Sequence, residues 1–130
     1  MANPFATGPN NEFNPPGVRN SFTTTISSGQ SLSSAIDLGS STLFAIQMPA
    51  AWTTAANITF QASYDGVTYC NMYDSNGTEM TVTGVAASEF IVLALPTQWI
   101  GVRFLKIRSG TSGTPVSQGA DRVLGLISVL

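Results

Sequence analysis

Short alternating runs of apolar and polar residues, separated by turn residues, constrain this chain more than any other feature of its sequence. The run Ile58–Tyr64 alternates in this way, and Asp65-Gly66 separates it from a second run, Val67–Tyr73. A period of two is typical of a strand with one buried face. Asp-Gly between two such runs predicts a two-residue hairpin, whose primed turn needs positive φ at both central residues.

The same pattern recurs over residues 21–130. Gly29-Gln30 predicts a further hairpin, and Asp74-Ser75-Asn76-Gly77 predicts a turn into the strand Glu79–Thr83. The continuous apolar run Phe90–Leu95 predicts a central strand that is buried on both faces. Further strands are expected at 22–26, 32–38, 43–48, 101–108 and 123–129. About eight or nine short strands predict an all-β fold, an antiparallel β-sandwich that is jelly-roll-like.

Residues 1–20 differ from the rest of the chain. They contain Pro4, Pro9, Pro15 and Pro16 together with five Asn. Proline lacks a backbone donor and Asn favours turns, so we expect an extended N-terminal arm that precedes a sandwich domain at 21–130. A disordered tail is one interpretation. An arm that orders against a partner is the other, because Phe5 and Phe13 could anchor it.

Charged residues make up only 9% of the 130 residues, against about 25% in typical globular domains. The sequence contains fifteen Ser and fifteen Thr, so the surface is expected to be neutral and rich in hydroxyl groups. A surface that is so poor in charge suits a subunit packed against neighbours, although a stable monomer is also possible. The net charge is −2 and the five basic residues are scattered, so nucleic acid is not an expected partner.

The residues for common catalytic chemistry are missing or dispersed. The sequence has no His, which removes the commonest general base and metal ligand. The seven carboxylates lie mostly in expected turns or in the arm, and no glycine-rich phosphate loop opens a helix. We therefore expect no enzyme and no cofactor. Asp74–Glu79 faintly resembles part of a calcium loop but offers few oxygen ligands, so a plain turn and no metal are expected.

Targeting and redox features are few. No segment is long enough to span a bilayer, and residues 1–5 lack the pattern of a signal peptide, so no membrane partner is expected. Cys70 is the single cysteine, which rules out an intramolecular disulfide. It lies in an alternating run and is expected to be buried.

Aromatic residues are the remaining candidates for a binding role. Trp52 and Trp99 lie at strand ends beside prolines, where an interface role is expected together with Phe5 and Phe13 in the arm. Tyr64 and Tyr69 lie in strands with an apolar pattern, so core burial is expected for both.

Three stretches resemble a group of small virion proteins of tailed bacteriophages. They are Leu43–Tyr73, Asp74–Val82 and Gly101–Ile127, and the resemblance covers residues 30–130 without the arm. It implies a capsid decoration (cement) protein with a jelly-roll or related core. Such proteins often sit as homotrimers on the lattice of the major capsid protein, on the exterior of a virion assembled in the host cytoplasm. The resemblance transfers no functional residue.

Two alternatives stay open. A carbohydrate-binding or receptor-binding module of a tail or head fibre would place Trp52 or Trp99 on an exposed platform beside polar groups. A neck or tail completion protein would differ from a decoration protein in its copy number per particle. The sequence does not distinguish these roles.

Overall fold

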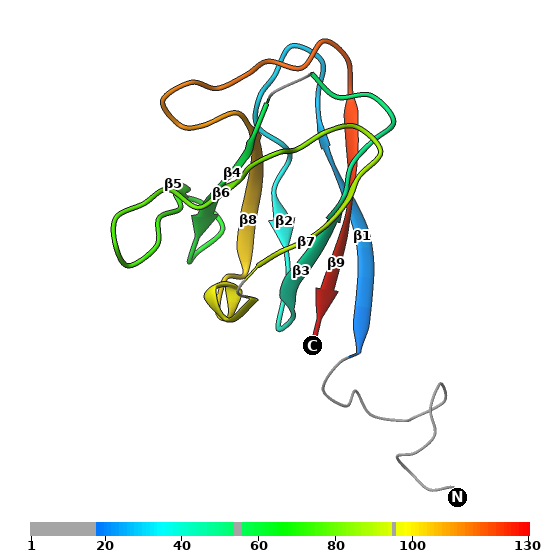
Figure 1. Ribbon diagram of the computed structural model, residues 1–130. Helices are drawn as coiled ribbons and strands as arrows, with labels where there is room; N and C mark the ends of the chain where they lie inside the picture. Colours follow the sequence, from blue (N-terminus) through cyan, green and yellow to red (C-terminus); the bar gives the residue numbers. More distant parts are fainter. Residues whose placement is uncertain (1–17, 54–55, 95) are drawn as a thin grey trace, which may run out of the picture.

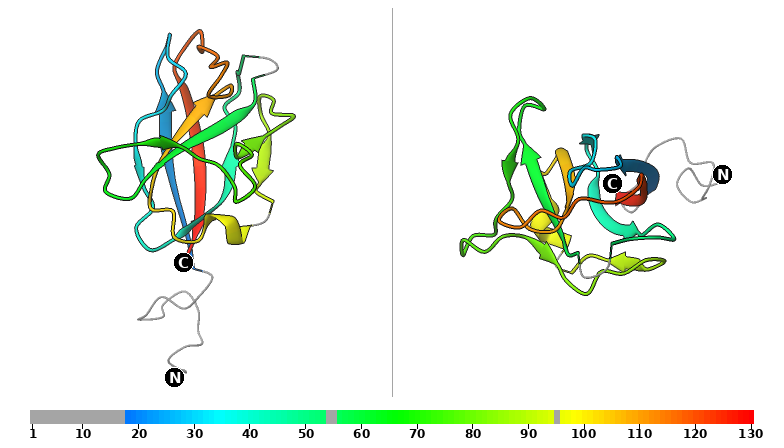
Figure 2. Two further views of the ribbon diagram at one scale, coloured as in Figure 1. Left: turned by 90° about the vertical axis from the view of Figure 1, so that its left-hand side faces the viewer. Right: turned by 90° about the horizontal axis from the view of Figure 1, so that it is seen from above.

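The chain folds into two antiparallel β-sheets packed face to face, which confirms the predicted all-β sandwich. The computed structural model describes residues 18–53, 56–94 and 96–130. Seen from above, β1, β9 and β3 form one layer, while β4 and β8 form the other (Figures 1 and 2). Sheet 1 has the order β1-β9-β3-β7, built from Arg19–Ile26, Arg122–Val129, Thr42–Gln47 and Phe90–Val92.

Sheet 2 has the order β2-β8-β4-β5, and the short strand β6 also pairs with β4. Its strands are Ile36–Asp37, Phe104–Ser109, Ile58–Ser63, Cys70–Asn71 and, for β6, Thr81–Val82. The chain passes repeatedly from one sheet to the other, and its first and last strands are neighbours. This arrangement is that of a jelly roll.

The longest ladder joins the two ends of the described chain. All eight residues of β1 pair with β9, from Arg19 opposite Val129 to Ile26 opposite Arg122. Beyond the ladder, the Leu130 N–H donates to the Val18 carbonyl at 2.9 Å. The first strand therefore includes Arg19 and Asn20, which were expected in the arm, while residues 1–17 lie outside the described residues.

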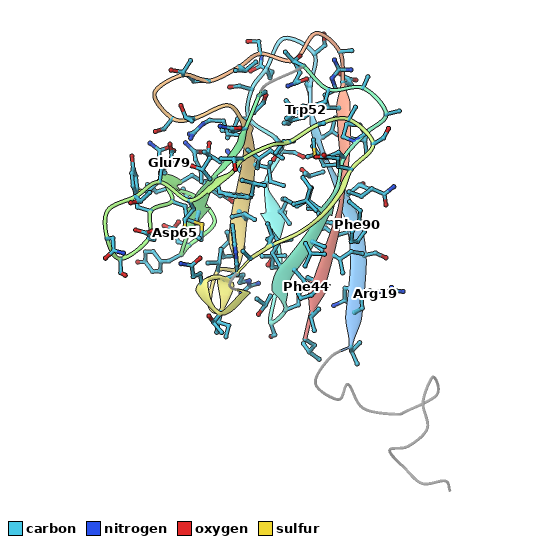
Figure 3. The ribbon with its side chains drawn as sticks, viewed as in Figure 1. Arg19, Phe44, Trp52, Asp65, Glu79 and Phe90 are labelled. Atoms are coloured by element: carbon cyan, nitrogen blue, oxygen red, sulfur yellow. The ribbon has the colours of Figure 1, made fainter. Side chains whose placement is uncertain are left out.

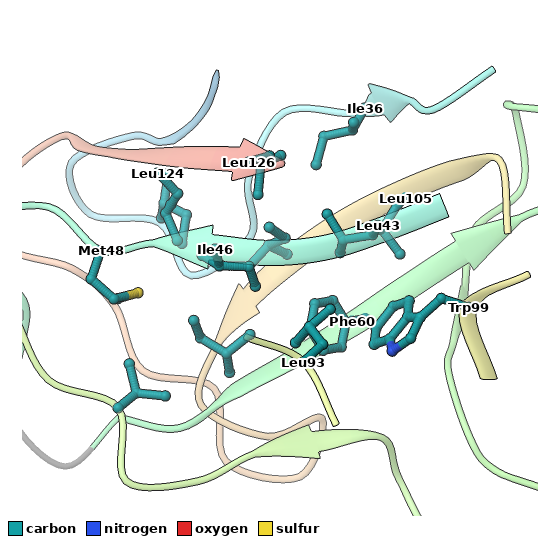
Figure 4. Close-up of a cluster of buried hydrophobic side chains, with 14 of the residues drawn as sticks. Ile36, Leu43, Ile46, Met48, Phe60, Leu93, Trp99, Leu105, Leu124 and Leu126 are labelled. Atoms are coloured by element: carbon teal, nitrogen blue, oxygen red, sulfur yellow. The ribbon is translucent and has the colours of Figure 1, made fainter. Parts of the chain in front are cut away.

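The core fills the space between the sheets. Strands from both layers contribute fully buried side chains, among them Leu43 and Ile46 from β3 and Leu105 and Ile107 from β8. Phe60 of β4 meets Trp99 edge to face, with ring centroids 4.7 Å apart and planes at 78° (Figure 4). This geometry is favoured because the positive ring edge meets the negative ring face.

Trp99 ends a short 3-10 helix, η2 (Pro96–Trp99), that the sequence pattern does not predict. The helix packs against β3 beneath the core. Within the described ranges, no helix is long and apolar enough to cross a membrane.

The apolar run Phe90–Leu95 does not form a central strand. Only Phe90–Val92 is a strand, and this β7 lies at an edge of sheet 1, paired with β3. Ile91 and Leu93 face the core, whereas Phe90 and Val92 are 57% and 56% exposed. The prediction was wrong because the outward side chains of this strand are as apolar as the inward ones.

Gly29-Gln30 turns the chain without forming a hairpin. After the turn the chain leaves sheet 1, because β1 pairs with β9 and β2 pairs with β8 of sheet 2. Gly29 has φ of 81°, and its N–H donates to the carbonyl of Gln118 at 2.8 Å. The positive φ is a property of glycine that local sequence indicates well, but the sheet to which each strand belongs is set by tertiary packing.

The segment around Asp65 is a wider loop than the predicted two-residue turn. β4 ends at Ser63, and Ala62 pairs with Cys70. Gly66 has positive φ but Asp65 does not, so the primed turn is absent. Instead, the Asp65 carboxylate accepts the N–H groups of Val67 at 2.9 Å and Thr68 at 3.0 Å. A side chain that satisfies loop donors in this way competes with the tight hairpin.

The wider loop changes the exposure of its neighbours. Tyr64 is 96% exposed, Tyr69 is half-buried, and the free Cys70 is exposed, so the expected burial of all three is wrong. The second turn is confirmed: the Gly77 N–H donates to the Asp74 carbonyl at 3.1 Å.

The core position of Phe60 gives a stability prediction. Phe60→Ala removes a fully buried ring and leaves a cavity beside Trp99, so the free energy of unfolding should fall by about 3–5 kcal/mol. Phe90→Ala, at an exposed site on β7, is the matched control and should change it by about 0.5 kcal/mol or less. Urea unfolding followed by circular dichroism measures both, and similar losses for the two variants would contradict this account of the core.

Candidate functional site

The four aromatic residues that were expected at an interface do not form an exposed surface in the described chain. Phe5 and Phe13 lie outside the described residues. Trp52 is 6% exposed and its Nε1–H donates to the Ala56 carbonyl at 3.1 Å, while Trp99 is 2% exposed against Phe60. Both indoles belong to the core, so neither offers the platform that a sugar would need. Neither residue lies at a strand end as expected, because Trp52 lies in the loop after β3 and Trp99 ends η2.

Other apolar side chains are exposed instead, and four of them gather on sheet 1. These are Phe44, Phe90, Val92 and Val123. Phe44 and Phe90 lie on the strands of sheet 1, on the other side of the molecule from Asp65 and Glu79 (Figure 3). The sequence pattern does not single out this group, because each member lies in a run that also contributes to the core.

The strand registers define the outward side of sheet 1. One row across it reads Thr23, Gly125, Gln47 and Phe90, and the next reads Ser21, Ile127, Ala45 and Val92. We call this surface the neutral face; its outward residues are Arg19, Ser21, Thr23, Thr25, Thr42, Phe44, Ala45, Gln47, Phe90, Val92, Val123, Gly125, Ile127 and Val129. Its single charged member, Arg19, lies at one end of β1.

A β-bulge adds an aromatic ring to the neutral face. The register of β3 against β9 shifts between Leu43 and Ala45, so Phe44 is the extra residue. The extra residue puts Phe44 and Ala45 on the same outward side of β3, where Phe44 is exposed while the small side chain of Ala45 is covered.

A shallow depression of about 280 Å³ lies in the middle of the neutral face. Gly125 lines it, together with Thr23, Gln47 and Phe90 from the same row. The missing side chain of Gly125 leaves this space between the longer side chains of the flanking strands.

The outward side of sheet 2 is different, because it carries charges that are engaged within the chain. Arg103 binds Asp37 through two contacts, Nε to Oδ1 at 2.9 Å and Nη2 to Oδ2 at 3.2 Å. The Lys106 ammonium lies 4.4 Å from the centre of the Tyr69 ring, a cation–π contact. The hydrogen bond from Arg103, supported by the Gly39 N–H, lowers the pKa of Asp37.

Arg108 is nearly buried and connects three segments of sheet 2. Its guanidinium lies 2.6 Å from Asn71 Oδ1, 3.3 Å from Thr59 Oγ1 and 3.4 Å from Glu79 Oε2. Glu79 in turn accepts the N–H of Ser112. These contacts tie β8 to β5, to the turn before β6 and to the loop after β8.

A larger groove of about 600 Å³ lies between β6 and β7, with Phe60 and Trp99 among its lining residues. Two carboxylates line it, and both are engaged: Asp74 accepts N–H groups from its own turn, and Glu79 holds Arg108 and Ser112. Among the residues described here, no cluster of three or more His, Cys, Asp or Glu could hold a metal. The groove therefore presents mixed walls, in which hydroxyl groups of Thr78, Thr81 and Thr83 stand beside apolar side chains and the carboxylates serve local structure.

The comparisons with known proteins give one structural likeness. No family model and no curated protein matches the chain. The crystal structure of the SPBc2 prophage-derived protein YomS superposes with a TM-score of 0.53 at 12% identity, over 87% of this chain and 96% of that one. At this identity the likeness shows a shared fold alone.

The buried ion pair gives a second prediction. Glu79→Gln leaves the Arg108 charge without its carboxylate at a site where the two side chains are 8% and 15% exposed, so the free energy of unfolding should fall by about 3 kcal/mol or more. Asp37→Asn removes a carboxylate from a pair that is more than half exposed and should cost clearly less. Chemical unfolding of both variants measures the difference, and equal losses would contradict the assigned role of Arg108.

The exposed pair gives a pH-dependent prediction. The folded pKa of Asp37 lies below its unfolded value, so its ionised form contributes stability above the unfolded pKa and loses that contribution as the pH falls through the folded pKa. In Arg103→Met the main cause of the shift is gone, and the Asp37 pKa should rise toward its ordinary value. NMR titration of the carboxyl carbon measures this, with Lys106→Met as a control that should leave it unchanged. A pKa of Asp37 that does not move in Arg103→Met contradicts the pairing.

Proposed function

We propose that this chain is a non-enzymatic capsid decoration protein of a tailed bacteriophage, which binds the lattice of the major capsid protein and stabilises the head. The proposal rests mainly on the observation that nearly all charged side chains bind groups of the same chain. Ten of the eleven charged side chains in the described residues contact a group of the same chain, Arg19 being the exception. The surfaces left for partners are thus apolar or hydroxyl-bearing.

Two further observations support the proposal. The fold is shared with YomS, whose name gives it a prophage origin. A jelly roll also presents its sheet faces and end loops on a rigid scaffold, which suits a subunit that is held by many modest contacts on a repeating lattice. The proposed place of action is the exterior of the virion, after assembly in the host cytoplasm.

Residues 1–17 are the proposed capsid-binding arm. They precede β1 and contain Phe5 and Phe13, with Glu12 as their single charged side chain. Two aromatic side chains on a segment rich in Asn and Pro could occupy apolar pockets of the capsid protein, and the repeated lattice would multiply a weak contact into stable binding.

The proposed decoration role predicts how the chain and its deletion variant bind to particles. Particles stripped of the protein should be refilled by the purified wild-type chain to a copy number proportional to the capsid lattice. Deleting residues 2–17 should reduce occupancy at least tenfold, since two buried Phe side chains contribute well over 1.4 kcal/mol. Quantitative gel densitometry of repurified particles measures the occupancy.

The controls separate the arm from the fold and the head from the neck. The deletion ends before Val18, whose carbonyl accepts the N–H of Leu130, so β1 and its ladder are retained. Phe5→Ser with Phe13→Ser should reproduce the loss, whereas Asn3→Ser with Asn11→Ser should not. Full occupancy by the truncated chain would refute the arm, and a copy number of one ring per particle would instead identify a neck or tail protein.

A further inference from the structure

Gly125 is the feature of the neutral face that the fold itself does not explain. It interrupts the otherwise larger side chains of β9, yet its φ is not in the left-handed region. An ideal Cβ at this position would lie 3.4 Å from the Cβ of Gln47, which is ordinary van der Waals contact. Neither the backbone conformation nor a clash of an added Cβ therefore requires glycine here. Glycine in a strand interior weakens the strand and often marks a close approach from outside.

We propose that the neutral face binds the neutral face of a second copy of this chain, with Phe90 of each copy seated in the depression over Gly125 of the other. This inference deepens the proposed role by naming one partner, but it concerns the isolated chain and does not need the capsid.

The depression and the ring match in size and position. The depression of about 280 Å³ exceeds the cavity of about 150 Å³ that accommodates benzene in an engineered protein. Gly125 and Phe90 lie in one row, on either side of Gln47. Two strand spacings separate them, about 10 Å. A two-fold axis above Gln47 would bring each Phe90 over the Gly125 of the other copy.

Symmetry makes this contact self-complementary. In an isologous interface residue i meets residue j and residue j meets residue i, so a face that carries both a projecting ring and a hollow can pair with itself. At the axis the two Gln47 amides would meet, and an amide offers both a donor and an acceptor.

The charge distribution favours a second copy over a different partner. Identical faces bring like charges together, which costs several kcal/mol when charges are present. The neutral face avoids this cost because its one charge, Arg19, lies four residues from Thr23 along β1, about 13 Å from the Gly125 row. A partner of opposite charge would instead select a charged face, such as that of sheet 2.

The available area indicates a weak contact. The four strands hold 25 residues, and each covers about 16 Å² at a strand spacing of about 4.8 Å and a rise of about 3.3 Å, so the face measures about 400 Å² per copy. A total of about 800 Å² lies below the 1,200–2,000 Å² of stable complexes. The pair should therefore form at high protein concentration, or where a lattice holds copies close together.

Sedimentation of the purified full-length chain, from a few micromolar to about 1 mM, tests the proposal. The wild type should show a monomer–dimer equilibrium. Gly125→Val, which fills the depression, and Phe90→Lys, which replaces the ring with a charge, should each weaken dimerisation at least tenfold. Tyr64→Lys, at a 96% exposed site outside the neutral face, is the matched control and should dimerise like the wild type.

Two readouts exclude simpler explanations. The unfolding midpoint of Gly125→Val at low concentration should equal or exceed that of the wild type, so lost association would not reflect lost folding. In a Cys70→Ser background, Gln47→Cys should crosslink between copies with a short bis-maleimide, whereas Tyr64→Cys should not.

Several results would overturn the inference. They are a wild type that stays monomeric throughout, a trimer, or an association that Gly125→Val and Phe90→Lys leave unchanged. If deletion of residues 2–17 were the only change that abolished association, the arm and not a second neutral face would be the occupant of the depression. Failure to bind particles, with dimerisation intact, would reject the capsid role and leave this inference standing.

Discussion

The position of β9 is the constraint on which the rest of the structure depends. This last strand lies between β1 and β3 in the middle of sheet 1, pairing with both. It also supplies Leu124 and Leu126 to the core. Sheet 1 therefore cannot form until the C-terminal residues are available, and its contacts span nearly the whole domain. Contacts of such long range make folding slow relative to helical proteins of similar size.

The same strand separates two surfaces of different chemistry. Its inward side chains complete the core, and its outward ones form the centre of the neutral face, while the charged groups are gathered on sheet 2 and in the loops. The two ion pairs are satisfied within sheet 2 and its loops, and Arg122 of β9 binds Gln118, so the neutral face carries no charge except Arg19. The few charges of the chain are therefore unevenly distributed: the neutral face carries almost none, and the rest of the surface carries nearly all of them.

The fold class could be predicted from the sequence because alternation and turn residues are local signals. A strand formed at Ile58–Ser63, within the predicted run Ile58–Tyr64, and the Asp74–Gly77 turn formed as predicted. The sheet to which each strand belongs could not be predicted, since Gly29 turns the chain in the same way whether the next strand pairs within the sheet or crosses to the other. Likewise, Asp65 favoured a wider loop through its carboxylate, which a search for an Asp-Gly turn does not consider.

The candidate site was largely missed for a related reason. Apolar residues were assigned to the core, but Phe90 and Val92 are apolar and outward. Tryptophans beside prolines were assigned to a surface, but Trp52 and Trp99 fill the core. Two signals were present in the printed sequence: a glycine within the apolar pattern of 123–129, and Phe44 in a run where consecutive apolar residues cannot all face inward. Neither can be interpreted without knowing which strands lie beside them.

The hydrogen bond between Leu130 and Val18 has a practical consequence for the fusion of foreign peptides to this protein. It places the C-terminal residue beside the start of β1, so a peptide fused after Leu130 would emerge next to the proposed capsid-binding segment and compete with it for space. The loop 110–115 lies at the opposite end of the sandwich (Figure 1), and open space surrounds Gly113 at its tip. A foreign epitope inserted there would project away from the C-terminal residue and from the start of β1.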